Sequence, residues 1–169
     1  MMHTSYMNTI TIRAIQPEDN AALAKIIRNA LEEFKANKPG TVYYDPTTDN
    51  LYEVFKTQKS KYFVMEENGI TLGGGGVYPT QNLPADTCEL VKLYLSNAAR
   101  GKGLGKLLME KCFAAAKQIG YKKIYLETMP ELHIAVPLYE KMGFTYLPAP
   151  LGNSGHDGCD IWMIKDLGL

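Results

Sequence analysis

The stretch that decides the fold reads Glu89-Leu-Val-Lys-Leu-Tyr-Leu-Ser-Asn-Ala-Ala-Arg-Gly-Lys-Gly-Leu-Gly105. Its first part is apolar enough to predict a strand, and the amphipathic pattern of residues 104–119 predicts a helix directly after the three glycines. Glycine has no Cβ atom, so its backbone N–H can approach a ligand closely, and the start of a helix adds unpaired donors and a positive dipole end. The stretch therefore predicts a phosphate-binding loop between a strand and a helix.

Two common phosphate-binding motifs do not fit this loop. A P-loop would place glycine at position 100 and serine or threonine at position 107, where this chain has Arg100 and Leu107. The dinucleotide fingerprint G-x-G-x-x-G would need a further glycine at Lys106 or Leu108. An ATP-binding loop is therefore disfavoured. The loop alone is also compatible with a flexible, glycine-rich connection between strand and helix that binds no ligand.

Composition excludes several broad classes of function. The chain has 18 Lys plus Arg and 18 Asp plus Glu, so its net charge gives no general attraction for nucleic acid or anionic lipid. Residues Met1 to Asn8 are polar, and no apolar run approaches the length of a membrane span, which predicts a cytoplasmic location. The length predicts a single globular domain over residues 1–169.

Residues that could bind a metal are few and poorly spaced. Cys88, Cys112 and Cys159 are odd in number and far apart, which predicts free thiols rather than a disulfide framework or a zinc site. His156 and Asp157 lie near Cys159, but their spacing matches no standard metal site. We therefore expect no metal.

The apolar patterns predict alternating strands and helices. Strands are expected at 9–15, 61–66, 70–78, 89–95, 123–128, 144–147 and 159–164, and helices at 17–34, 51–58, 104–119 and 134–142. Asn68-Gly69 indicates a hairpin, and the run Gly73 to Gly76 indicates a bulge or a close neighbour within a strand. Residues 89–128 form a strand-helix-strand unit, whose strands should be parallel with a right-handed crossover. The expected fold class is α/β (α+β), with a mixed, mostly antiparallel sheet and helices on both faces.

Two motifs in this order resemble those of the GNAT superfamily of acyl-CoA-dependent N-acyltransferases. The first, Arg/Gln-x-x-Gly-x-Gly/Ala, is met by Arg100, Gly103 and Gly105, and the second, Ala-x-x-Leu-Tyr-Glu-Lys-x-Gly-Phe, is met from Ala135 to Phe144. The resemblance covers nearly the whole chain. It implies a GNAT-like sheet whose central parallel strands splay apart at the cofactor site, here between Leu95 and Glu127.

The resemblance implies acetyl-CoA as the cosubstrate. Its pyrophosphate would lie on the backbone N–H groups of the loop, with added charge from lysines; these residues are Arg100, Gly101, Lys102, Gly103, Leu104, Gly105 and Lys106. Its pantetheine arm would pair like an extra strand with the backbone of Leu93, Tyr94 and Leu95. Many family members contact the cofactor through an asparagine at the position of Leu132, so that contact is not expected here.

Three residues are candidates for the chemistry. A primary amine is almost fully protonated at neutral pH, so a base is useful. Glu89 and Glu127 match catalytic glutamates of different family members, and the choice between them stays open. Strand alternation predicts that Glu89 shares a face with Leu93 and Leu95, where burial would raise its pKa. Tyr139 matches the family tyrosine that gives a proton to the thiolate of CoA, and the resemblance assigns the oxyanion to a backbone N–H near Leu95.

The implied reaction is direct transfer of acetyl from acetyl-CoA to a primary amine of a small molecule or peptide, in a ternary complex. The acceptor pocket is expected where no motif matches, at Tyr43-Tyr44-Asp45, in the loop before Glu89 and at residues 152–160, with His156 able to contact the substrate. The alternative function is a catalytically inactive, CoA-binding regulatory module. A homodimer remains an alternative to a monomer.

Overall fold

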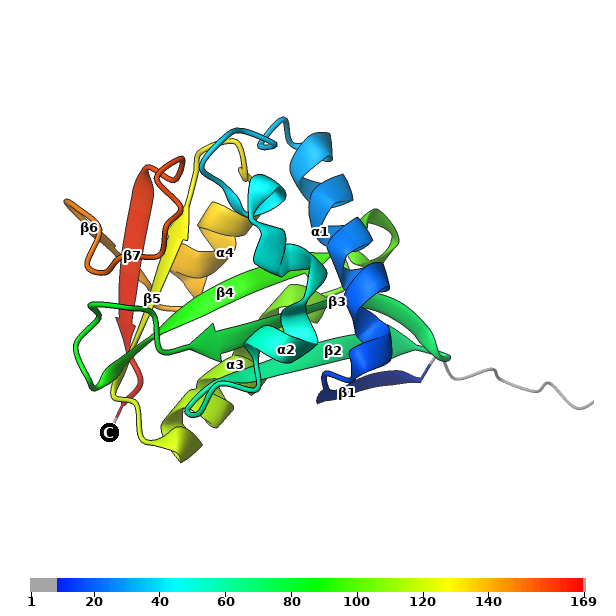
Figure 1. Cartoon of the computed structure of the whole chain (residues 1–169), viewed down its shortest axis with the longest axis horizontal. Coiled ribbons are helices and arrows are strands. Elements are labelled where there is room, and N and C mark those ends of the chain that lie inside the picture. The colour runs from blue at the N-terminus through cyan, green and yellow to red at the C-terminus, as the bar shows by residue number, and fades with distance from the viewer. Residues whose placement is uncertain (1–8, 169) are drawn as a thin grey trace, which may run out of the picture.

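Residues 9–168 are described by the computed structural model, and the segment Met1 to Asn8 lies outside the described residues. Seven strands form one sheet in the order β1-β2-β3-β4-β5-β7-β6 (Figure 1). The strands are β1 Ile10–Ala14, β2 Lys61–Glu67, β3 Ile70–Tyr78, β4 Thr87–Leu95, β5 Lys123–Thr128, β6 Thr145–Leu147 and β7 Ile161–Asp166. All neighbours are antiparallel except β4 and β5, which are parallel. The expected mixed sheet with a central parallel pair is confirmed.

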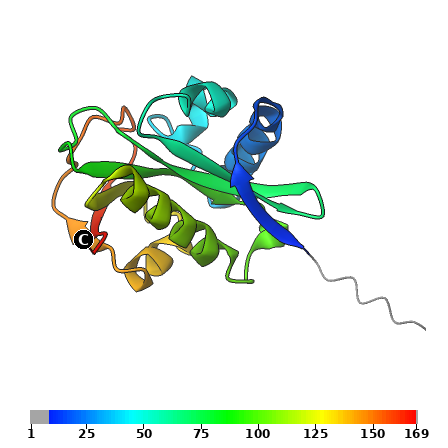
Figure 2. The ribbon, with the colours of Figure 1, turned by 90° about the horizontal axis from the view of Figure 1, so that it is seen from below.

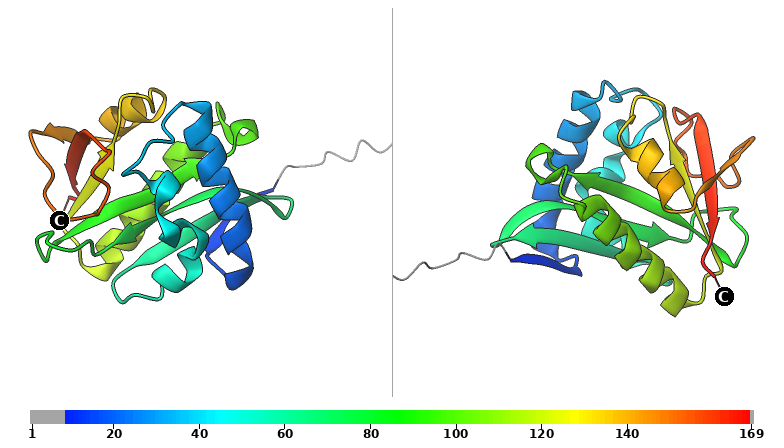
Figure 3. Two further views of the ribbon diagram at one scale, coloured as in Figure 1. Left: turned by 45° about the horizontal axis from the view of Figure 1, so that its top comes forward. Right: turned by 180° about the vertical axis from the view of Figure 1, so that it is seen from behind.

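Helices cover both faces of this sheet. They are α1 Asn20–Glu33, α2 Leu51–Val54, α3 Leu104–Ile119 and α4 Ala135–Lys141, with short 3-10 turns at Pro17–Asp19, Val42–Tyr44, Pro46–Asp49 and Asn97–Ala99. Figures 2 and 3 show α1 and α2 on one face and α3 and α4 on the other. The expected helix 17–34 starts as a 3-10 turn, because Pro17 leads into a tight first turn before α1. Among residues 9–168, none of the helices is long and apolar enough to cross a membrane.

Each face of the sheet has its own apolar core. On the α1 face, Leu23, Ile27 and Leu31 follow helical spacing and pack with Tyr62 and Val64 of β2. Full burial of one such side chain stabilises the folded state by roughly 1.5–3 kcal/mol. The two cores hold the sheet rigidly between the helices, and the functional cavity opens within that sheet.

One leucine of α3 is exposed. Leu104, Leu108 and Cys112 are buried, whereas Leu107 is 45% exposed. Met109 and Phe113, which directly follow Leu108 and Cys112, are also buried, so the buried face of α3 is broad.

The expected bulge lies between β3 and β4. Gly74 pairs with Tyr94 and Gly76 pairs with Val91, so two steps along β3 match three steps along β4. Lys92 lies inside the bulge with a φ of 51°. The glycines of β3 permit this close approach, because a Cβ atom on Gly75 would lie 2.4 Å from a methyl carbon of Leu93.

The bulge corrects the predicted face of Glu89. Leu93 and Leu95 pack against the core on the α3 face, the core that also contains Leu90. Glu89 precedes Leu90 and therefore points to the opposite face, the side of α1 and the loops beside it. The alternation of side chains between the two faces is shifted by one residue at the bulge. The side chains after Lys92 therefore point to the face opposite to the one that simple alternation predicts.

The two parallel strands stay together over a short distance only. β4 pairs with β5 at Thr87, Cys88 and Glu89, opposite residues 123–125, and no pairing is present between the later residues of these two strands. Beyond Glu89 the strands diverge, as Figure 1 shows. The separation leaves the backbone edge of β4 without a strand partner on that side, as expected from the sequence.

Candidate active site

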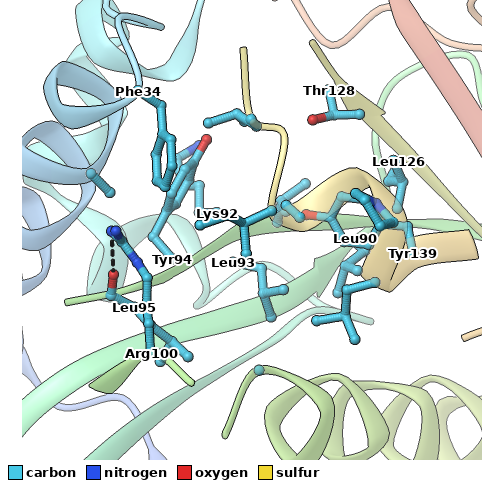
Figure 4. Close-up of a pocket in the computed structure, with 18 of the residues that line it drawn as sticks. Phe34, Leu90, Lys92, Leu93, Tyr94, Leu95, Arg100, Leu126, Thr128 and Tyr139 are labelled. Atoms are coloured by element: carbon cyan, nitrogen blue, oxygen red, sulfur yellow. Dashed lines mark hydrogen bonds between the residues drawn. The ribbon is translucent and has the colours of Figure 1, made fainter. Parts of the chain in front are cut away.

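One cavity of about 410 Å³ occupies the space between the separated strands. Its walls come from residues 89–95 of β4, residues 126–129 of β5, the start of α3 and the inner face of α4. Figure 4 shows Leu93, Tyr94 and Leu95 along one wall, with Tyr139 and Thr128 across from them. The structure thus brings the three predicted catalytic residues and the glycine loop to one cavity.

The phosphate cradle, residues 100–106, has the backbone expected of an anion site. Gly101 and Gly103 have φ values of 77° and 72°, and a Cβ atom on either would meet nothing within 4 Å. The first hydrogen bond of α3 runs from the N–H of Leu107 to the carbonyl of Gly103, at 3.3 Å. The N–H groups of residues 104–106 therefore have no partner within the helix, and they carry the positive end of its dipole.

Arg100 ties the cradle to the rest of the fold. Its guanidinium donates to the carbonyl of Leu95 at 3.2 Å, pairs with Glu33 and lies 4.8 Å from the ring centre of Phe34 (Figure 4). These contacts join the end of β4 to the end of α1. Lys102 is exposed, and Lys106 lies along the cavity. Arg100 thus positions the loop. Lys102 and Lys106 are exposed charges beside it, and Lys106 lies 4.0 Å from Glu110 in an exposed ion pair.

Glu89 is the most perturbed acid of the site. Its side chain is 3% exposed, and its Oε1 has no hydrogen-bond partner among the described residues. Burial, assisted by the nearby charge of Glu127, raises the pKa of Glu89 to about 8, although Thr80 and Lys92 act in the opposite direction. Burial has the effect on pKa that the sequence predicts, even though it occurs on the other face of the sheet.

Glu127 has a different environment. Its Oε2 accepts a hydrogen bond from the hydroxyl of Tyr125 at 2.7 Å, and its Oε1 accepts one from Ser154. The two bonds hold the carboxyl group of Glu127 in place. Burial and the bond to Glu127 together raise the pKa of Tyr125, so this phenol remains a donor. The two candidate bases therefore differ: one carboxyl has a free oxygen, and the other has both oxygens occupied.

Tyr139 lies on α4 at the wall of the cavity. Its side chain is buried, and its ring meets that of Phe144 edge-on at 5.9 Å. Burial, together with nearby Cys159, raises the pKa of Tyr139 to about 12. The hydroxyl therefore stays protonated at neutral pH and can act as a proton donor.

Lys92 and His156 line the cavity, and two further polar residues, Asp45 and Ser154, lie beside them without lining it. We call Asp45, Lys92, Ser154 and His156 the acceptor wall. Asp45 Oδ2 lies 2.7 Å from Nε2 of His156 and 3.8 Å from Nζ of Lys92. The backbone N–H of His156 donates to the hydroxyl of Ser154 at 3.1 Å, and that hydroxyl in turn donates to Glu127. The wall thus joins the loop at residues 41–49 to β5 through side chains.

Asp45 remains ionised in this wall. Burial alone would raise its pKa, but hydrogen bonds from His156 and Thr47, with the charge of Lys92, lower the pKa to about 2. The sequence predicted that Asp45 and His156 would belong to the acceptor pocket. His156 lines the cavity, and Asp45 contacts His156 from outside the lining.

The neighbouring tyrosines are a correction to that prediction. Tyr44 is 60% exposed, and the hydroxyl of Tyr43 donates to Glu32 on α1. Val42 lines the cavity in their place, because the 3-10 turn at Val42–Tyr44 directs successive side chains away from each other.

Sequence reasoning missed Lys92. It lies in an apolar strand, yet its side chain is 8% exposed. A lysine at a strand position flanked by apolar residues was the available signal, since buried lysines are rare unless they are paired. For metal binding, the described residues contain no group of three or more His, Cys, Asp or Glu side chains that could hold an ion.

Comparison with known proteins identifies the family. Residues 24–144 match the model of the Acetyltransferase (GNAT) family, and the chain therefore belongs to the GNAT family of acyl-CoA-dependent N-acetyltransferases. The chain is 39% identical over 158 residues to YjgM of Escherichia coli (strain K12), described as an uncharacterized N-acetyltransferase, covering 92% of this chain and 94% of that protein.

Two solved structures share the fold. A GNAT acetyltransferase of Staphylococcus aureus Mu50 superposes with a TM-score of 0.83 at 19% identity, covering 95% of this chain and 100% of the other. The protein yncA of Salmonella typhimurium, solved with its cofactor acetyl-CoA, has a TM-score of 0.74 at 23% identity and 95% coverage of both chains. The resemblance in sequence and the predicted fold are thus confirmed.

Proposed function

We propose that this protein transfers an acetyl group from acetyl-CoA to a primary amine by direct attack within a ternary complex. The separation of β4 from β5 carries the proposal, because β4 leads from the buried carboxyl of Glu89 to the phosphate cradle along a single cavity. An amine held at Glu89 and a thioester reaching in from the cradle would meet inside that cavity, away from bulk water.

The cradle suits the pyrophosphate of acetyl-CoA. The glycines at 101 and 103 leave open space where side chains would stand, and the N–H groups of residues 104–106 are available as donors. Lys102 and Lys106 add positive charge. The unpaired edge of β4 at residues 93–95 would bind the pantetheine arm through its backbone groups.

Glu89 is the better candidate for the general base. One of its oxygens is free, and its raised pKa makes it a stronger base than an ordinary carboxylate. It would take the proton of the amine, directly or through a water molecule, as the nitrogen attacks the thioester carbon. Glu127, fixed by Tyr125 and Ser154, would supply a constant negative charge that favours an ammonium group nearby.

Tyr139 would complete the reaction as the general acid. Its protonated hydroxyl would give a proton to the sulfur as the carbon–sulfur bond breaks, and a backbone N–H near Leu95 would hold the oxyanion. Cys159 also lines the cavity, but burial and the charges of Glu127 and Glu89 raise its pKa to about 12. Such a thiol is a poor nucleophile, which supports direct attack rather than an acyl-enzyme.

The proposal is tested with a panel of primary amines and acetyl-CoA. We expect release of free CoA that depends on the amine, together with the acetylated amine in the mass spectrum. Tyr139→Phe should lower turnover while CoA binding, measured by thermal shift, stays unchanged. Tight binding of CoA without acetylation of any amine would instead favour the regulatory module.

A further inference from the structure

Lys92 is a buried cation with unused hydrogen-bond donors. Its side chain is 8% exposed and lines the cavity, yet its ammonium group donates no hydrogen bond to any residue in the range 9–168. An ammonium group has three donors, and burial without partners is costly. Figure 4 shows Lys92 between Tyr94 and Leu93 at the wall of the cavity. These donors are therefore available to a molecule inside it.

Asp45 does not use up the charge of Lys92. One oxygen of Asp45 accepts from the N–H and the hydroxyl of Thr47, at 2.9 and 2.7 Å, and the other lies 2.7 Å from His156. Lys92 is 3.8 Å away, too far for a hydrogen bond. Burial lowers the pKa of Lys92, whereas the charges of Asp45 and Glu89 act against that shift. Asp45 thus favours the charged form of Lys92 without occupying its donors.

The acceptor side holds groups of opposite charge. Glu127 is a fixed carboxylate and Glu89 is the proposed base, whereas Lys92 offers a cation close enough that its charge and that of Glu89 act on each other's pKa. A simple cationic acceptor would be repelled by Lys92. A molecule that carries both an amine and an anionic group would match both kinds of charge.

The two loops on the acceptor side contact each other. The loop at residues 39–45 touches the loop at residues 154–158, where the N–H of Gly158 donates to the carbonyl of Gly40 at 2.8 Å. A Cβ atom on Gly40 would lie 2.0 Å from Asp157 Oδ1, so the two loops are in direct contact. This contact holds together the two loops that carry Asp45 and His156, the residues beside Lys92.

We propose that Lys92 binds a carboxylate of the acceptor, so that the acceptor is a small molecule whose primary amine and carboxylate lie a few bonds apart, as in a free amino acid. The inference rests on the proposed function. Lys92 selects the acceptor and holds its amine toward Glu89, while the cradle binds acetyl-CoA independently of that choice.

The test compares matched acceptors that differ only in charge. Each free amino acid in the panel is paired with its carboxamide, and a lysine-containing peptide is included. For the best amino acid, we expect wild-type kcat/KM to exceed that for its carboxamide by about tenfold or more, because a hydrogen bond to a charged group is lost. Lys92→Met should bring the ratio close to one, and Lys92→Arg should preserve a preference for the acid.

Each outcome separates the two proposals. Turnover of carboxamides or of the peptide at least as fast as of amino acids overturns the role of Lys92 and leaves the acetyltransferase activity in place. A ratio that is unchanged in Lys92→Met has the same meaning, provided that CoA still raises the melting temperature of the variant. A loss of activity that is equal for both members of each pair would show a merely structural lysine. Failure of the wild type to acetylate any acceptor overturns the proposed function itself.

Discussion

The phosphate cradle and the acceptor wall both contribute residues to the same cavity but are built in different ways. The cradle is a continuous run, residues 100–106, and it presents backbone N–H groups. The wall takes Asp45, Lys92, Ser154 and His156 from separate segments, and it presents side chains. A cosubstrate shared by a whole family can be bound by a local motif, whereas an acceptor particular to one member is bound by residues that only the fold brings together.

The largest effect should come from the carboxyl on the acceptor side. Glu89→Gln keeps the shape of the side chain but removes the base, so kcat should fall by about 100-fold while the affinity for CoA stays unchanged. Steady-state kinetics and CoA titration measure the two quantities. Glu127→Gln serves as the matched variant and should lose less activity, because Glu127 supplies charge rather than proton transfer. The reverse order would make Glu127 the base.

Substitutions in the cradle should weaken the binding of CoA without changing the preference among acceptors. Replacing Gly101 and Gly103 together by alanine places two side chains at positive φ, at roughly 1 kcal/mol each, so the Kd for CoA should rise by about 30-fold. The ratio of rates among acceptors should not change. Gly120→Ala is the control, since Gly120 also has positive φ, 114°, but lies at the far end of α3. Equal loss of CoA affinity in the control would show that the effect is strain in α3 and not loss of the cradle.

A smaller effect concerns pH. Because the pKa of Glu89 is raised to about 8, the ionised base is a minority species at neutral pH and becomes dominant above pH 8. We expect kcat/KM to rise by about tenfold from neutral pH to a plateau, following that ionisation. Glu89→Gln should abolish the inflection near 8. A wild-type profile that is flat through this range would contradict the assignment of Glu89, while the role of the cradle would stand.

The smallest effect is expected within the acceptor wall. Asp45→Asn keeps the contact with Thr47 but removes the charge that holds Lys92 and His156, so KM for the acceptor should rise a few-fold. The KM for acetyl-CoA should stay the same, as initial-rate measurements with each substrate varied can show. Asp49→Asn, which disturbs only an exposed pair with Arg28, is the matched control. A rise in the KM for acetyl-CoA would remove the separation between wall and cradle.

The cradle was predictable because its determinants are adjacent in sequence. Glycines at fixed spacing, the strand before them and the helix after them are all visible in residues 89–119, and the motif around Tyr139 follows after one strand. The parallel pair of strands follows from the same pattern, whereas the order of all seven strands was not predicted. The sheet, its parallel pair and the family are confirmed, and the roles of the cradle residues stay predictions.

The acceptor wall was less predictable because the bulge in β4 changes which side chains face the cavity. Gly73 to Gly76 indicated an irregular strand, but the extra residue lies in β4 at Lys92, which a pattern of glycines in β3 could not locate. The bulge turns Glu89 away from the face of Leu93, and only the folded chain brings Asp45 and His156 together. Such contacts depend on loop geometry, which sequence periodicity does not encode.

The most direct measurement follows a radiolabelled acetyl group. The protein is incubated with labelled acetyl-CoA, with and without a primary amine that gives turnover, and label is counted on protein, amine and CoA. Direct attack predicts label on the amine only, no label on the protein in either sample, and intersecting initial-rate plots for the two substrates. Label retained on the protein would contradict direct transfer, and label that never leaves acetyl-CoA with any amine would contradict the proposed activity.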